Sequence, residues 1–203
     1  RCVVAGFHVP ALAGTDHVFA RQLKPLLRPG RHKLIGCTRR MQGMMVAPGN
    51  PLRLHGLADL ARPGVRFVNR QAGSGTRLLT EHLLAGQGLA SDRIAGFDSA
   101  PAEDSHLAVA AAVASGVADA ALGIEAAARR FGVDFVPLVE EEYFLVCLRD
   151  ALDHPAVLKL REVLQGPGWR ETVAALPGYA SARSGEVLSL TRALPWWRFR
   201  GRS

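Results

Sequence analysis

Residues 67–77 read FVNRQAGSGTR and connect an apolar run to a helical pattern through a loop that holds two glycines. The run VRFVN at 65–69 is typical of a strand, and between Thr76 and Ala85 leucines recur on one helical face. Glycines at 86 and 88 are suited to end that helix. The segment therefore predicts a strand, a loop and a helix in direct succession, which is the repeating unit of an α/β fold.

The loop does not match three familiar motifs that combine glycine, serine and basic residues. A P-loop requires a lysine after its last glycine, and residues 70–77 contain no lysine. A dinucleotide-binding fingerprint requires a third glycine where Leu78 stands, and a nucleophile elbow requires one residue between Ser74 and each flanking glycine. We therefore expect a non-catalytic loop in a protein that is not an enzyme.

The loop does have the chemistry of an anion-binding site. The first backbone N–H groups of a helix lack internal partners and carry partial positive charge, and glycines leave that backbone open to a ligand. The candidate ligand residues are Arg70, Gly73, Ser74, Gly75 and Thr76, with Arg77 as a further source of charge. The alternative is a plain helix N-cap by Ser74 or Thr76, worth about 1 kcal/mol and needing no ligand. The loop alone leaves both interpretations open.

A second segment, EDSHLAVAAAVASG at 103–116, repeats this design. Ser105 is suited to cap a helix of small apolar residues, which we expect to be buried. His106 stands in the first turn, where it could donate to an anion or simply be exposed. We expect the two helix N-termini to converge on one small anion.

The rest of the chain alternates short apolar runs with helical patterns. Strands are expected at 1–7, 33–37, 42–48, 118–124, 133–139 and 142–148, and helices at 54–64, 125–132, 154–165 and 168–176. This alternation predicts α/β layers around a largely parallel sheet.

Composition narrows the class of protein. A hydrophobic content of 48% with 21% charged residues is that of a globular chain, and no apolar run is long enough to span a membrane. Cys2, Cys37 and Cys147 lie far apart in the sequence and have neither the spacing of metal ligands nor that of a disulfide framework. The histidines also lack the spacing of metal ligands. We expect no metal, no cofactor and no membrane contact, and a cytoplasmic location.

The formal charge of +7 is spread along the chain, and only the tail RALPWWRFRGR at 192–202 combines basic with aromatic residues. Such a tail could stack on nucleic-acid bases. We favour the alternative, in which its tryptophans pack on the domain.

Four segments together resemble one family. They are QGMMVAPGNP at 42–51, FVNRQAGSGTRLL at 67–79, SHLAVAAAVASGVADAALGI at 105–124 and DFVPLVEEEYFLV at 134–146. They look like the periplasmic-binding-protein-like domain of molybdate- and tungstate-responsive proteins, which is found behind a helix-turn-helix in bacterial regulators and in some molybdopterin-biosynthesis proteins. It is similar to the tungstate-binding proteins of ABC transporters, which carry an Arg-x-x-x-Ser-Gly-Thr loop. The family domain begins with an earlier strand and polar loop, and this sequence resembles it only from Val3 to Glu186.

The resemblance implies a type II periplasmic-binding fold, with two α/β lobes joined by two crossing strands and a ligand cleft between them. Residues 1–46 and 141–190 would form one lobe, residues 47–140 the lobe with the anion loops, and 191–203 a basic aromatic tail. Arg70, Ser74, Gly75 and Thr76 match the family's tungstate loop. Ser105, His106 and Tyr143 occupy family positions near the cleft, and His8 corresponds to a loop of the opposite lobe.

The function implied is non-catalytic sensing of molybdate or tungstate, as the effector domain of a transcriptional regulator whose longer parent carries a helix-turn-helix DNA-binding domain. Hydroxyls, backbone N–H groups and an arginine offer only donors, which suits a fully ionised oxyanion. One alternative is an accessory domain that handles a phosphorylated or molybdopterin-type ligand. Another is a degenerate domain kept for protein contacts.

Overall fold

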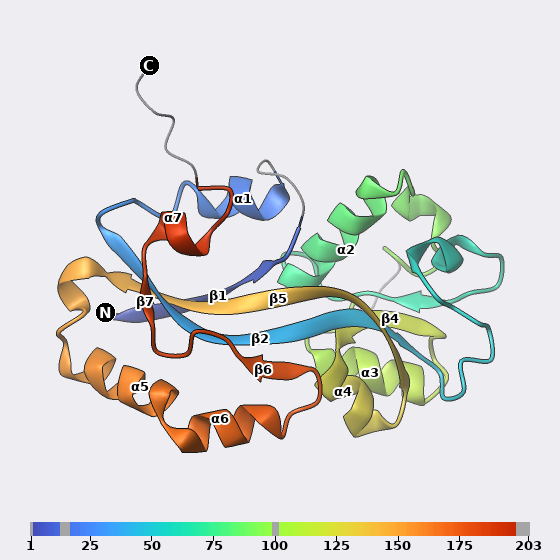
Figure 1. Ribbon diagram of the computed structural model, residues 1–203. Helices are drawn as coiled ribbons and strands as arrows, with labels where there is room; N and C mark the ends of the chain where they lie inside the picture. The colour runs from blue at the N-terminus through green and yellow to red at the C-terminus, as the bar shows by residue number, and fades with distance from the viewer. Residues whose placement is uncertain (1, 13–16, 99–101, 198–203) are drawn as a thin grey trace. The chain divides into compact units, whose positions relative to one another are not determined.

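The computed structural model describes residues 2–12, 17–98 and 102–197. The chain divides into two compact units (Figure 1). Unit 1 holds residues 1–40 and 140–203, and unit 2 holds residues 41–139. Two strands pass from one unit to the other along the chain, β2 at His32–Val46 and β5 at Asp134–Leu148.

The continuity of these two strands corrects the sequence prediction, which divided each into a pair of shorter strands. The polar residues 38–40 interrupt the apolar pattern of β2, but they do not interrupt its backbone pairing. Thr38, Arg39 and Arg40 pair with strand β6, Tyr179–Ser181, so the ladder hydrogen bonds continue through the polar stretch. Hydrophobic patterning alone therefore underestimates the length of β2.

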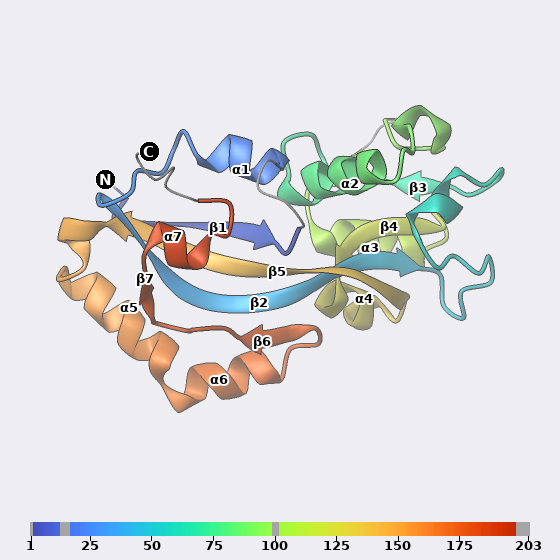
Figure 2. The same cartoon turned by 45° about the horizontal axis from the view of Figure 1, so that its top comes forward.

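Unit 1 has strands covered on both sides by helices (Figures 1 and 2). β1 pairs antiparallel with β5, and β2 pairs antiparallel with β6 and β7. In both views α5 and α6 lie on one side of these strands, and α1 and α7 lie on the other. The bounds are β1 Val4–Pro10, α1 Val18–Leu23, η3 Arg149–Ala151, α5 Pro155–Gln165, α6 Pro167–Ala174, β7 Val187–Leu188 and α7 Leu190–Ala193.

Unit 1 has two hydrophobic cores, one on each side of β2. Successive residues of β2 pack into opposite cores, because side chains alternate between the two faces of a strand. Leu34 packs in the core beneath α1 and α7, whereas Ile35 packs against α5. The first of these cores also contains Leu194 and Trp196, and Trp196 is only 3% exposed. Packing of the tail on the domain is therefore confirmed for Trp196, while residues 198–203 of the predicted basic tail lie outside the described residues.

Unit 2 repeats the layered arrangement. Residues 42–46 of β2 pair antiparallel with β4, and β3 pairs parallel with β4. α2 lies on one side of these strands, and α3 and α4 lie on the other (Figures 1 and 2). The bounds are η1 Leu57–Ala61, β3 Phe67–Val68, α2 Gly75–Gly86, η2 Ser91–Arg93, α3 His106–Ala114, β4 Ala120–Ile124 and α4 Glu125–Phe131.

The small-residue helix α3 buries one face, so the prediction of a buried helix is confirmed in part. Val109, Ala110 and Val113 pack with Met45 of β2 and with α4, and Leu107 is the large apolar side chain of α3 that is exposed. The prediction of a largely parallel sheet, by contrast, is wrong. Among the described strand pairs whose register is known, only β3 and β4 run parallel. The alternation of strands and helices predicts a layered fold, but it does not predict strand direction, which depends on how the chain connects one strand to the next. The short strand β6, for example, pairs antiparallel with β2.

No helix among residues 2–12, 17–98 and 102–197 is long and apolar enough to cross a membrane.

Candidate functional site

The candidate loop after β3 is fixed by Asn69, which is 3% exposed. Its side-chain Nδ2 donates to the carbonyl of Phe97 at 3.2 Å, and its Oδ1 accepts from the backbone N–H of Arg70 at 2.9 Å. The backbone N–H of Glu103 donates to the carbonyl of Asn69 at 3.0 Å, and that of Gln71 donates to the carbonyl of Glu103 at 3.0 Å. The loop of residues 69–75 is thereby tied to residue 103, just before α3.

Arg70 strengthens this connection with its side chain. Its Nε donates to the carbonyl of Glu103 at 3.3 Å and its Nη2 to the carbonyl of Asp104 at 2.8 Å. Asp104 precedes Ser105, the N-cap of α3. The structure thus brings together the two segments that the sequence singled out separately, within unit 2.

Ser105 caps α3 as predicted, and of the two candidates for the cap of α2, Ser74 and Thr76, it is Ser74 that caps the helix. Ser74 Oγ accepts from the backbone N–H of Arg77 at 3.2 Å, and Ser105 Oγ accepts from that of Ala108 at 3.1 Å. A hydroxyl that accepts one hydrogen bond keeps its own proton, so each serine can cap its helix and still donate to a ligand. Capping and anion binding are therefore compatible at both helices.

The two glycines of the loop leave space beside the backbone. Gly73 has a φ of +83°, in the left-handed region that favours glycine. A Cβ atom added to Gly73 or to Gly75 would meet no described atom within 4 Å. Gly75, the first residue of α2, has neither a positive φ nor a close neighbour that would require glycine.

Thr76 and Arg77 are held by contacts within unit 2. Thr76 is 4% exposed and its Oγ1 accepts from the Nε2 of buried Gln42 at 3.1 Å. Arg77 forms ion pairs with Glu81 and Asp98, and its guanidinium lies 5.0 Å from the centre of the Phe97 ring. The two carboxylates offset the positive charge that Arg77 was expected to add to the loop.

His106, the first residue of α3, is partly buried. A Cβ atom on Gly123 of β4 would lie 3.4 Å from the Nδ1 of His106 and 2.5 Å from the Cε of Met45. Gly123 therefore leaves room for the His106 ring beside β4. This position excludes the interpretation of His106 as merely exposed.

The other two candidates, His8 and Tyr143, lie in unit 1. They are cross-strand partners on β1 and β5, and their rings stack with centres 4.5 Å apart and planes at 29°. The Tyr143 ring extends over Gly6, where an added Cβ would be 2.0 Å from the tyrosine oxygen. Burial, followed by the charge of Arg40, lowers the pKa of His8 to about 3, so its imidazole is neutral at pH 7.

Sequence reasoning missed the polar cluster that accompanies His8. Arg40 Nε donates to Glu141 Oε1 at 2.5 Å and Arg40 Nη1 to the Tyr179 hydroxyl at 3.3 Å. The Arg40 and Glu141 side chains are 12% and 5% exposed. No local pattern marks this ion pair, because its two residues are 101 positions apart. Among the described residues, no three His, Cys, Asp or Glu side chains lie close enough together to hold a metal ion.

Comparison with known proteins identifies the fold. Residues 1–165 match the model of the PBP superfamily domain. The chain is 31% identical over 188 residues to the uncharacterized protein YvgK of Bacillus subtilis, covering 93% of this chain and 59% of YvgK, so it spans about three-fifths of that relative.

Two solved structures are similar in fold. One is the substrate-binding domain of a putative molybdenum ABC transporter from Clostridium difficile, with a TM-score of 0.54 and 13% identity, covering 89% of this chain and 77% of that one. The other is the sulfate-binding protein SubI from Mycobacterium tuberculosis, with a TM-score of 0.56 and 16% identity, covering 72% and 58%. These similarities confirm the mixed α/β fold of type II periplasmic-binding proteins.

Proposed function

The chain belongs to the PBP superfamily, whose domains bind small ligands, and from this premise we propose that it binds molybdate or tungstate through the paired loops of unit 2. The ligand residues are Arg70, Gly73, Ser74, Gly75, Thr76, Ser105 and His106.

The observation that carries the proposal is the joining of the two loops by Arg70. Its guanidinium contacts the carbonyls of Glu103 and Asp104, and the next residue caps α3. The segment that begins with Arg70 itself leads to the Ser74 cap of α2. Two helix N-termini with serine caps are thus connected through one arginine, and each N-terminus contributes partial positive charge. Simple capping would require neither the connection nor a glycine at position 75.

The donor chemistry favours a fully ionised oxyanion. Molybdate, tungstate and sulfate only accept hydrogen bonds at neutral pH, whereas phosphate retains a proton that requires an acceptor. Serine hydroxyls, backbone N–H groups and a guanidinium supply donors. The similarity in fold to a domain of a putative molybdenum transporter and to a sulfate-binding protein is consistent with this class. The resemblance of the loop to tungstate-binding loops favours molybdate or tungstate over sulfate.

We further infer that binding serves sensing and not catalysis. The described loop contacts provide donors and caps, with no paired nucleophile and base among them. A ligand that binds one conformation of a domain more tightly than another shifts the domain toward that conformation. The difference in binding free energy sets the size of the shift, which a second domain can detect. An effector domain of a bacterial transcriptional regulator, acting in the cytoplasm, is the role that fits this behaviour.

The test is isothermal titration calorimetry of the purified chain with molybdate, tungstate, sulfate and phosphate at constant ionic strength. We expect saturable micromolar binding of molybdate or tungstate, and sulfate and phosphate at least tenfold weaker. If sulfate binds as tightly as molybdate or tungstate, the ligand assignment is wrong and the chain is a sulfate-binding protein. If none of the four anions binds but a pterin phosphate does, the result would support the alternative of an accessory domain for a molybdopterin-type ligand.

A further inference from the structure

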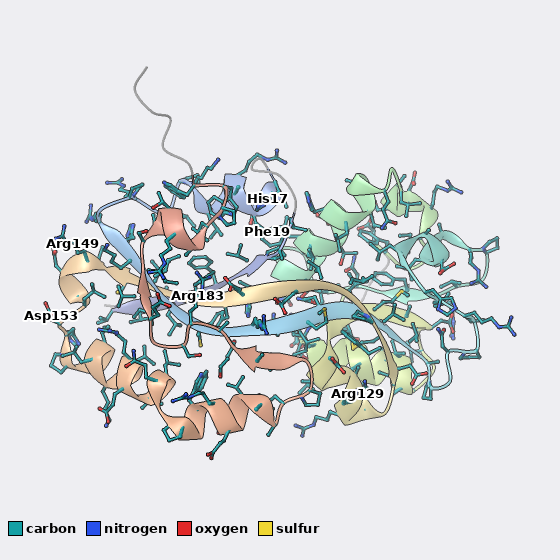
Figure 3. The ribbon with its side chains drawn as sticks, in the orientation of Figure 1. His17, Phe19, Arg129, Arg149, Asp153 and Arg183 are labelled. Atoms are coloured by element: carbon teal, nitrogen blue, oxygen red, sulfur yellow. The ribbon has the colours of Figure 1, made fainter. Side chains whose placement is uncertain are left out.

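A glutamine occupies a core position of β2 in unit 2. Side chains alternate along a strand, so Gln42 shares one face of β2 with Met44 and Val46, which pack in the apolar core that also holds Leu84 of α2. Gln42 is 1% exposed. Arg129 of α4, by contrast, extends outward from unit 2 in Figure 3, and its side chain is 57% exposed. Burial of an amide is unfavourable unless hydrogen bonds replace its water, so a glutamine at this position needs a specific partner.

The partner of Gln42 lies in the first turn of α2. Gln42 Nε2 donates to Thr76 Oγ1 at 3.1 Å, across 34 positions of the chain, and Thr76 is 4% exposed. Thr80, one turn further along α2, is fully buried, and its Oγ1 donates to the carbonyl of Thr76 at 2.8 Å. Within the described part of unit 2, the buried polar residues are Gln42, Asn69, Thr76 and Thr80. All four belong to the candidate loop and α2 or contact them.

The direction of the Gln42–Thr76 bond decides what Thr76 offers to a ligand. An amide N–H only donates, so the Thr76 hydroxyl accepts from Gln42 and keeps its own proton for another acceptor. Thr76 is also the second residue of α2, where the backbone N–H has no partner within the helix. Thr76 therefore presents two donors. An anion without a proton accepts from both, whereas the O–H of hydrogen phosphate would face a donor where it needs an acceptor.

We propose that Gln42 is a positioning residue of the anion site. By donating to Thr76, Gln42 holds the hydroxyl as a donor to the ligand, and the site thereby selects fully ionised oxyanions over hydrogen phosphate. Gln42 acts through Thr76 and does not contact the anion. This role rests on the proposed function, because it assigns a source for the selectivity of that site. Both residues belong to unit 2.

The experiment compares Gln42→Met with the parent chain in calorimetric titrations with molybdate, tungstate, sulfate and phosphate. Methionine fills irregular core positions well, but it cannot donate to Thr76, whose hydroxyl can then rotate and accept as well as donate. We expect molybdate, tungstate and sulfate to bind about tenfold or more weakly than to the parent, and phosphate to lose less than about threefold. Gln42→Leu also lacks the donor and should show the same change in selectivity. Urea unfolding establishes that each variant is folded.

A double variant tests whether Gln42 acts through Thr76. Thr76→Val removes the hydroxyl, so adding Gln42→Met to Thr76→Val should change the affinity for molybdate by less than about twofold. Thr80→Val is the matched control, because it removes a buried hydroxyl that contacts the carbonyl of Thr76 and not its hydroxyl. Thr80→Val should keep the parent's ratio of molybdate affinity to phosphate affinity.

Titrations of Gln42→Met that match the parent would overturn the role of Gln42 and leave the anion site in place. Equal losses for all four anions would also overturn it, since a loosened loop weakens binding without changing selectivity. Losses that multiply in the double variant would show that Gln42 does not act through Thr76. If the parent itself binds none of the four anions, the proposed function fails and the role of Gln42 fails with it.

Discussion

The guanidinium of Arg70 donates to the backbone carbonyl of Asp104 at 2.8 Å, one residue before the cap of α3. Two residues separated by 34 positions are joined by this bond. Since Asp104 participates through its carbonyl, the bond does not depend on the charge of an acidic side chain. Arg70 can therefore position the loop and also contribute positive charge to it.

Replacing Arg70 with alanine should lower the affinity for molybdate or tungstate at least tenfold. The variant loses both a charged donor and the connection between the loops, and hydrogen bonds to charged groups contribute about 1.5–3 kcal/mol. Arg70→Lys should restore the charge but not the two-pronged contact, and should bind with intermediate affinity. Arg66→Ala is the control, because Arg66 pairs with Asp119 and has a 56% exposed side chain. Calorimetric titration that gives the same dissociation constant for Arg70→Ala and Arg66→Ala would remove Arg70 from the site.

Ser74→Ala separates capping from binding. Loss of the cap should destabilise the chain by about 1 kcal/mol, and loss of the hydroxyl donor should also weaken anion binding about tenfold or more. Ser189 is a matched control, since its Oγ accepts from the backbone N–H of Arg192 and caps α7 in unit 1. Ser189→Ala should cost similar stability in urea unfolding while leaving the titration unchanged. If both variants bind as the parent does, Ser74 is only a cap.

Local sequence patterns predicted the features that depend on near neighbours. The strand before Asn69, the helix after Ser74 and both serine caps follow from residues within a few positions of one another. The apolar composition of α3 predicted that it packs against the sheet, but it did not predict that Leu107 is left exposed.

Features that depend on the path of the chain were not predicted. Arg77 was expected to add charge to the loop, yet it pairs with Asp98, 21 positions away. The buried Arg40–Glu141 pair joins β2 to β5 across 101 positions. The same limit explains the error over strand direction, since pairing of β6 with β2 is set by the return of the chain and not by the apolar pattern of either strand.

The two loop glycines should respond differently to alanine. Gly73→Ala places a side chain at a φ of +83° and should destabilise the chain by about 1–2 kcal/mol. Gly75→Ala should leave stability unchanged or raise it by up to about 1 kcal/mol, because Gly75 begins α2 and alanine favours helices. In our proposal the new methyl group of Gly75→Ala nevertheless occupies space needed by the anion, so affinity should fall at least tenfold. Urea unfolding and calorimetry on both variants test this, and undiminished anion affinity in Gly75→Ala would exclude close approach of a ligand at that residue.

His8 should make the chain less stable in acid. Its pKa is about 3 in the folded chain, chiefly because of burial and then because of Arg40, against 6.5 when unfolded. Between these values the unfolded chain binds a proton that the folded chain excludes, so stability falls as the pH falls through this window and is unaffected by His8 above it. His8→Gln should therefore flatten the dependence of unfolding free energy on pH, by as much as about 1 kcal/mol per pH unit between pH 6 and 4. Parallel slopes for His8→Gln and the parent in urea unfolding would show that the folded chain accommodates the charged imidazole.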